Sequence, residues 1–203
     1  MQMALNQRKR ELNVKNENRA RATRTISFLL FLAASCQAFA DSHPDVEAAF
    51  LKYAEASKIF DTQRMTNAMH PEALGRFRKT IDAALNGPKK DQAATELLPL
   101  FSANSVDEYS KMSDVEVYKQ LNDTIAKSAP ELLELMSQAT YEIVSTSLKD
   151  DLAYVNYNLT MKIEEKEIKQ LVVQTLKKHE GNWLLMLPST AEASIAGIEK
   201  RFN

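Results

Sequence analysis

The chain has 203 residues, with 26 Lys and Arg against 27 Asp and Glu and a formal net charge of −1. This length favours one domain with a sizeable hydrophobic core. The single cysteine, Cys36, excludes a scaffold held together by disulfides, so the core alone must hold the fold.

Residues 1–40 contain the three parts of a secretory signal peptide. Seven basic residues precede the short apolar run Ile26–Ala34, and Ala38-Phe39-Ala40 places small side chains one and three positions before a cut. The apolar run is shorter than the ~20 residues of a membrane-spanning helix. We therefore predict a signal peptide over residues 1–40, cleavage after Ala40, and a periplasmic or secreted location for a single domain over residues 41–203.

Two alternatives remain open for this N-terminal segment. An uncleaved membrane anchor is disfavoured by the short apolar run and by the suitable cleavage triplet. The stretch Leu32-Ala33-Ala34-Ser35-Cys36 resembles a lipobox, although Ala33 stands where that pattern has leucine. A lipid on Cys36 would add a membrane tether.

Removal of residues 1–40 changes the charge of the protein. This segment holds seven of the 26 basic and two of the 27 acidic side chains, which leaves 19 basic and 25 acidic groups and a net charge of −6. An acidic domain lacks the basic stripe that nucleic-acid phosphates require. We expect no nucleic-acid partner, and membrane contact only through the signal peptide or a lipid on Cys36.

The first part of the domain, residues 41–139, is predicted to be helical. The first helix is expected to begin near Ser42, which can cap it, with Asp45 three residues later. A second helix is expected to begin at His70-Pro71-Glu72 and to stop at Asn86-Gly87-Pro88. Glycine commonly ends helices, and proline cannot continue them.

Four Ser-x-x-Glu pairs have the spacing of a capping box, in which serine accepts an amide of the first turn and glutamate reaches back to the serine amide. They predict short helices through the middle of the chain and a C-terminal helix over residues 189–202. The four pairs are Ser105/Glu108, Ser113/Glu116, Ser128/Glu131 and Ser189/Glu192.

Residues 140–188 change from the helical period to a period of two. Ala153–Ile163 alternates apolar and polar side chains, which predicts a half-buried antiparallel strand. Three neighbouring strands are expected at Tyr141–Leu148, Ile168–Lys177 and Trp183–Leu187. The connections between them are short and polar, as in a four-stranded meander.

The short connections also suggest a register. If Glu164 pairs with Glu167, then Met161 faces Gln170 and Tyr157 faces Gln174, and opposed residues share one side of the sheet. A turn centred on Glu180-Gly181 adds Leu176, Trp183, Leu185 and Leu187 to the same side. The register of the first strand stays open, because a slip of one residue inverts its faces.

Several stretches resemble the nuclear-transport-factor-2-like superfamily, over most of residues 41–203. Phe50-Leu51-Lys52-Tyr53, Asp61 and Met69–Leu74 resemble its paired opening helices, and Leu176–Trp183 resembles its common last hairpin. The resemblance implies an α+β cone: N-terminal helices, a curved antiparallel four-stranded meander, a C-terminal helix, and a helix packed on the concave sheet around a pocket. The helical stretch 91–139 is longer than the simplest members carry. The superfamily includes enzymes, binding modules and dimerising partners, so the fold alone does not give the function.

Metal and acid–base chemistry find little support in the sequence. The histidines His43, His70 and His179 stand alone, without ligands at a recognisable metal-binding spacing, and no cofactor is expected. Enzymes resembling ketosteroid isomerase place a carboxylate base beside a phenol in an apolar pocket. Tyr53 and Asp61 are the candidates here, but their spacing of eight residues does not put them on one helix face.

Three functions remain as hypotheses. The favoured one is a non-catalytic module that binds a small apolar ligand or a protein, with Tyr157, Gln170, Gln174 and Trp183 as ligand-binding residues on the inner sheet face. The second is a small-substrate isomerase or hydrolase-like enzyme on the same fold. The third is a cell-envelope subunit that forms a homodimer through the outer sheet face, whose residues are Tyr154, Asn156, Asn158, Thr160, Leu171 and Val173.

Overall fold

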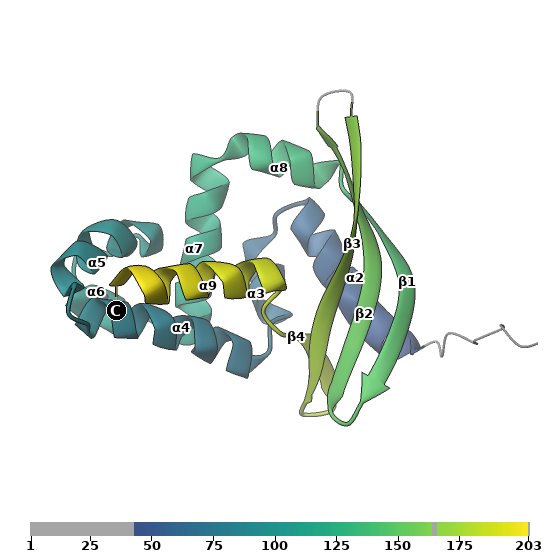
Figure 1. The fold of residues 1–203 in the computed structure, drawn as a ribbon, viewed down its shortest axis with the longest axis horizontal. Coiled ribbons are helices and arrows are strands. Elements are labelled where there is room, and N and C mark those ends of the chain that lie inside the picture. The colour runs from purple at the N-terminus through teal and green to yellow at the C-terminus, as the bar shows by residue number, and fades with distance from the viewer. Residues whose placement is uncertain (1–42, 164–165, 203) are drawn as a thin grey trace, which may run out of the picture. The chain divides into compact units, whose positions relative to one another are not determined.

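The computed structural model describes residues 43–163 and 166–202. Within them a series of helices precedes a four-stranded antiparallel meander, and a last helix follows it (Figure 1). The predicted α+β layout is therefore confirmed. The predicted signal peptide, Cys36 and Ser42 lie outside the described residues. In the described part, no helix is both long and apolar enough to span a membrane.

Most of the described helices precede the sheet, and α9 follows it. α2 carries an apolar face toward the sheet, and α4 and α7 are the other long helices of the N-terminal part. Their bounds are α2 Pro44–Lys58, α3 Thr62–Asn67, α4 Pro71–Asn86, α5 Lys90–Leu97, the 3-10 helix η1 Leu98–Phe101, α6 Val106–Ser110, α7 Asp114–Ser128, α8 Pro130–Ser137 and α9 Ser189–Phe202.

Two of the four predicted caps form in the structure. Ser113 makes the complete capping box with Glu116 at the start of α7. Ser105 caps α6 by accepting the amide of Glu108 at 3.1 Å, but the Glu108 carboxylate accepts the amide of Asn104 at 2.8 Å instead of reaching back to Ser105.

The other two predicted caps are wrong. Ser128 is the last residue of α7, and its hydroxyl donates to the carbonyl of Thr124 at 2.7 Å. The next helix then begins at Pro130. Ser189 is the first residue of α9 itself. The spacing alone does not distinguish a cap from a serine that bonds back into the preceding turn.

The start of α2 and the segment after it also differ from the prediction. The N-cap of α2 is His43, which makes no side-chain capping bond. Asp61 caps the separate helix α3, accepting the amide of Arg64 at 2.9 Å. The chain turns between these helices at Phe60, whose φ is +50°.

All four predicted strands are present, in the order β1-β2-β3-β4. Their bounds are β1 Thr140–Lys149, β2 Leu152–Ile163, β3 Lys166–His179 and β4 Asn182–Leu185. After β4 the chain leaves the sheet and enters α9, which packs on α4 and α5 (Figure 1). The helix on the inner face of the sheet is α2, which contacts β1, β2 and β4.

The predicted register between β2 and β3 is wrong by two residues. Tyr157 pairs with Val172 instead of Gln174, because Ile163 pairs directly with Lys166. A shift of two residues retains the face of every side chain, since side chains alternate with a period of two. The predicted inner face therefore survives the error.

The pairing of β1 with β2 contains an irregularity that the sequence did not predict. The pairing with β2 shifts between Ile143 and Ser145, which leaves Val144 as a bulge with 52% of its surface exposed. Tyr141 and Ile143 pack against the core before the bulge, and Thr146 is buried after it. The inward positions thus change from odd to even numbers within one strand.

Candidate functional site

A groove of about 590 Å³ lies between α2, α3 and β4; we call it the Trp183 groove. Its walls come from segments far apart in the chain, which the sheet and the two helices bring together. The lining residues are Asp45, Ala48, Ala49 and Lys52 of α2, Arg64, Asn67 and Ala68 at α3, and Gly181, Asn182, Trp183 and Leu184 of the last hairpin.

The indole of Trp183 is fixed at the wall of this groove. Its Nε1 donates to Oδ2 of Asp45 at 2.8 Å, and this hydrogen bond lowers the pKa of the Asp45 carboxyl. Asp45 lies in the first turn of α2, where the helix dipole favours a negative charge. The contact joins the start of α2 to β4. The Nζ of Lys178 lies 5.7 Å from the centroid of the indole ring.

The turn before Trp183 depends on glycine. Gly181 has a φ of +84°, which side-chain-bearing residues rarely adopt, and it lines the groove. Here the predicted turn at Glu180-Gly181 is confirmed, with His179 pairing with Asn182 across it. The tight turn places β4 where Leu185 can accept the amide of His70 at 2.8 Å.

The charged groups at the groove are cationic except for Asp45. Lys52 and Arg64 line it, and Arg64 makes only a 3.9 Å contact with Glu55, between side chains that are at least half exposed. Such surface pairs contribute little energy. Both cations are therefore available to an anion, beside an apolar wall that includes Ala48, Ala49 and Leu184.

Tyr157 is a core residue in the structure. Its ring lies 4.6 Å from that of Phe50 and 5.8 Å from that of Tyr141, measured between centroids. Burial raises the pKa of Tyr157 to about 12, and it also raises the pKa values of Tyr53, Tyr118 and Tyr141. The phenols therefore stay protonated at neutral pH.

Gln174 and Gln170 have different surroundings from each other. Gln174 is 3% exposed, and its Nε2 donates to the carbonyls of Thr175 at 2.9 Å and Met186 at 2.8 Å. The side-chain amide of Gln174 therefore links β3 to the segment after β4, and its N–H donors are already hydrogen-bonded within the protein. Gln170 is exposed and lies opposite Leu159 in the upper part of the sheet. Of the four predicted ligand-binding residues, only Trp183 lines the groove.

Two of the histidines, which are far apart in the sequence, lie close together in the structure. His70 and His179 have ring centroids 5.2 Å apart. His70 is buried, its Nδ1 accepts the amide of Glu72 at 3.1 Å, and burial lowers its pKa. Even so, the described residues contain no group of three or more His, Cys, Asp or Glu that could hold a metal ion.

Sequence reasoning missed Asp45, Lys52 and Arg64 as groove residues. Each is an ordinary charged residue on an exposed helix face, and no spacing relates α2 and α3 to the last hairpin. They become neighbours only because α2 contacts both α3 and β4. A scan against models of protein families and a search of curated proteins both returned no match for this chain.

Proposed function

We propose that the chain is an exported, non-catalytic binding module whose Trp183 groove takes a small amphipathic anion with an apolar body. The observation that carries the proposal is the combination of a fixed indole with two cations, Lys52 and Arg64, around one groove. A nuclear-transport-factor-2-like ancestry and a periplasmic or secreted location are part of the proposal. The motifs of residues 50–74 and 176–183 support the first, and the leader pattern of residues 1–40 supports the second.

The size and chemistry of the groove fit a small ligand. About 590 Å³ falls within the roughly 300–1,000 Å³ of typical small-molecule sites, which combine apolar walls with a few placed polar groups. Asp45 holds the indole N–H, while Lys52 and Arg64 are free to meet an anionic head group. A carboxylate on an aliphatic chain is the simplest ligand that pairs with the two cations and also contacts the apolar wall.

The enzyme alternative requires a base in an apolar environment. Among the described residues, no Asp or Glu is buried. Asp61 caps α3 and Tyr53 lies on α2 with its pKa raised by burial, so the pair suggested by the sequence has separate structural roles. A binding role therefore has the stronger support.

The groove contains its own reporter, because Trp183 is the only tryptophan in the chain. We would titrate the protein, below the micelle concentration of each probe, with decanoate, decanol and decyltrimethylammonium while recording tryptophan fluorescence. Decanoate should give a saturable change, decanol a weaker one, and the cation none. Replacing Lys52→Gln and Arg64→Gln together should weaken decanoate binding at least about tenfold, since each charged hydrogen bond contributes about 1.5–3 kcal/mol.

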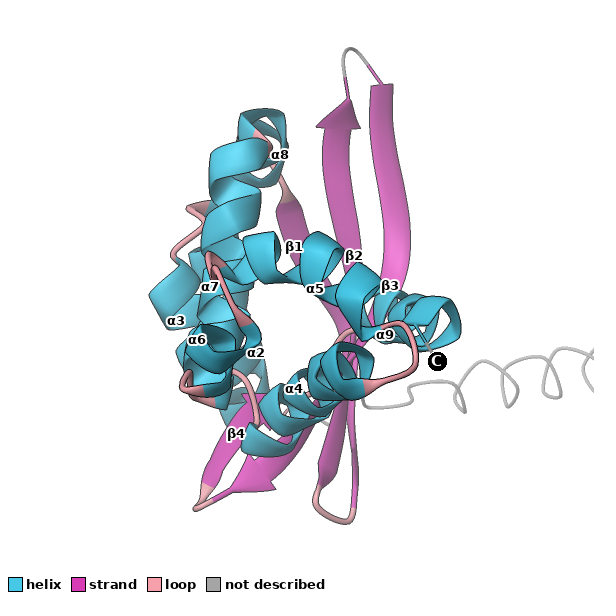
Figure 2. Cartoon of the chain, turned by 90° about the vertical axis from the view of Figure 1, so that its left-hand side faces the viewer, coloured by secondary structure: helices cyan, strands magenta, loops and turns pink. Residues whose placement is uncertain are grey.

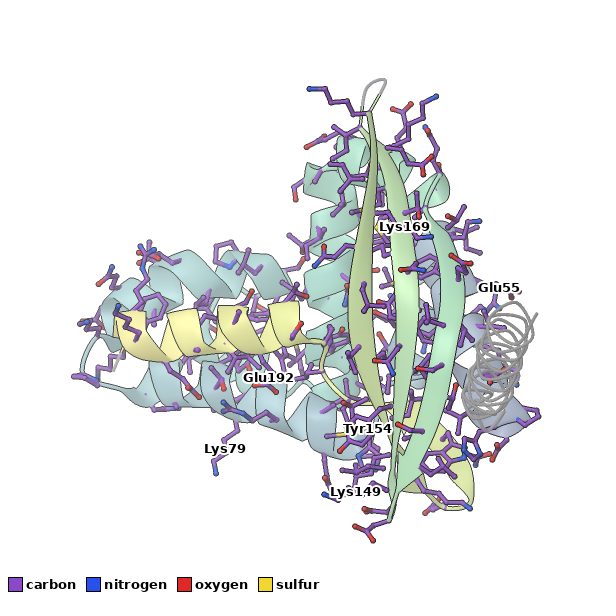
Figure 3. The ribbon with its side chains drawn as sticks, turned by 45° about the vertical axis from the view of Figure 1, so that its right-hand side comes forward. Glu55, Lys79, Lys149, Tyr154, Lys169 and Glu192 are labelled. Carbon is purple, nitrogen blue, oxygen red and sulfur yellow. The ribbon has the colours of Figure 1, made fainter. Side chains whose placement is uncertain are left out.

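The matched control is Lys79→Gln, a lysine that extends from α4 away from the sheet (Figure 3). Like each of the two groove substitutions, it removes one positive charge, and it should leave the titration unchanged. An equal response to all three probes, or unchanged decanoate binding in the double variant, would rule out the proposed site.

Export is checked on the same preparation. The full-length chain is expressed in a bacterial host with a periplasm, and the intact mass of the isolated protein should correspond to residues 41–203. Retention of residues 1–40 would contradict the signal-peptide hypothesis, and a lipid mass on Cys36 would select the lipoprotein alternative.

A further inference from the structure

One edge of β3 has no neighbouring strand along most of its length. β3 has 14 residues, but β4 pairs only with its last part, Leu176–His179. On the side away from β2, no strand of the described chain pairs with residues 166–174, which we call the β3 edge. Figure 2 shows the upper part of β3 as the outermost strand on that side of the sheet.

The backbone groups of the β3 edge point outward. The carbonyl of Thr175 accepts the amide of Met186 at 2.9 Å, so it points away from β2. Alternate residues of a strand direct their backbone groups to the same side. The N–H and C=O groups of Val173, Leu171 and Lys169 therefore also point off the sheet, and such a row is a template for another strand.

Three of the four apolar side chains of this edge are exposed, alongside five polar or charged ones. Leu171 is 61% exposed, Val173 49% and Ile168 43%. Lysines often protect such edges from pairing. Here, however, the Nζ of Lys169 is held 3.0 Å from Oε2 of Glu142 on β1, which draws its charge across the outer face and away from the edge (Figure 3).

We propose that the β3 edge pairs antiparallel with the same edge of a second copy of this chain, about a two-fold axis at Gln170. The pairing joins two four-stranded sheets into one continuous sheet. The free edge begins at Lys166 and ends before Thr175, whose carbonyl is already used. Pairing of its whole length with itself places the axis at its midpoint, which is Gln170.

The side chains are self-complementary in this register. On the inner face, Gln170 lies opposite the partner's Gln170. On each side of this pair, Ile168 of one chain lies opposite Val172 of the other. An amide carries both a donor and an acceptor, so it can pair with its own copy. On the outer face Lys169 lies opposite the partner's Leu171, which avoids directly opposed like charges. The β3 edge therefore complements the same edge of a second copy, whereas a strand of another sequence would need a side-chain pattern that matches it.

Cysteine cross-linking tests the register in a Cys36→Ser background. Gln170→Cys should form an intermolecular disulfide on mild oxidation, because a non-hydrogen-bonded pair places Cα atoms about 4.5 Å apart, within disulfide range. Ile168→Cys alone should remain unlinked, because it faces the partner's Val172. The double variant Ile168→Cys with Val172→Cys should link. Absence of a Gln170→Cys dimer on a non-reducing gel, or equal linking by Ile168→Cys alone, would overturn the proposal.

Sedimentation of the native chain, without any of the cysteine substitutions, tests whether the protein dimerises. We expect a concentration-dependent dimer, and Leu171→Lys should raise its dissociation constant at least about tenfold, because it opposes the partner's Lys169. Val144→Lys is the control, since Val144 is 52% exposed on β1 at the other edge of the sheet. A monomer up to about millimolar concentration, or equal effects of the two lysines, would refute the proposed dimer.

Discussion

The helical part formed by α4–α7 and α9 differs from the upper part of the sheet in how completely it buries its apolar residues. Phe101 is fully buried in the helical part, and Phe202 of α9 is 1% exposed. In the upper sheet, Ile168 and Leu171 have 43% and 61% of their surface exposed. The helical part buries its large aromatic side chains, whereas the upper sheet leaves large aliphatic ones exposed. We therefore expect local stability to be higher in the helical part than in the upper sheet.

Polar contacts show the same contrast. In the helical part, the partly buried guanidinium of Arg78 donates to the carbonyl of Met112 at 2.6 Å and lies 4.4 Å over the ring of Tyr109, which joins α4 to α6. On the outer face of the sheet, Asn156 bonds Ser145 and Asn158 bonds Glu142, between β2 and β1. These polar side chains pair across β1 and β2 on the outer face, beside the exposed apolar side chains of β3.

The largest expected effect compares a buried ring with an exposed side chain. Phe101→Ala removes a ring that packs on Phe77 and Tyr109 at centroid distances of 6.2 and 5.2 Å. It should lower the free energy of unfolding by about 3–5 kcal/mol. Leu171→Ala should change it by less than about 0.5 kcal/mol in the monomer. Urea unfolding at low protein concentration measures both, and similar losses would break the distinction between the two regions.

A second comparison uses the two glutamines of β3. Gln174→Leu leaves the buried carbonyl of Met186 without its side-chain donor and should cost about 1–3 kcal/mol of unfolding free energy. Gln170→Leu, at an exposed position, should stay within about 0.5 kcal/mol. Thermal and urea unfolding of both variants would test this. Equal free energies of unfolding for the two variants would mean that the hydrogen bonds of Gln174 do not stabilise the fold.

The smallest expected effect is a dependence of stability on pH. Burial lowers the pKa of His70 below its usual 6.5, and its Nδ1 must stay unprotonated to accept the amide of Glu72. As the pH falls below 6.5, the unfolded chain takes up a proton that the folded chain does not. The contribution of His70 is therefore present above pH 6.5 and is lost on acidification.

Urea unfolding between about pH 7 and about pH 5 measures this slope. His70→Asn keeps a capping acceptor and should flatten it, whereas His43→Asn, at a partly exposed position, should not. Parallel slopes in the native chain and in His70→Asn would exclude His70 as the origin.

Local patterns predicted the sheet well and its pairing less well. The alternation in Ala153–Ile163 predicted β2, because a half-buried strand requires one apolar face. The two-residue register error retained that face, but nothing local indicated the bulge at Val144. In the helices, Ser113 and Glu116 formed the expected box, while Ser128 bonded backward into its own helix.

The sequence by itself determined the elements of this protein: where strands alternate, where glycine permits a turn at Gly181, and where serine can satisfy free amides. These features depend on residues a few positions apart, so a linear pattern records them. The tertiary structure alone decided that Trp183 meets Asp45, that His70 meets His179, and that β4 ends too early to cover β3. Those outcomes depend on packing between distant segments, whose free energy no short stretch of sequence contains.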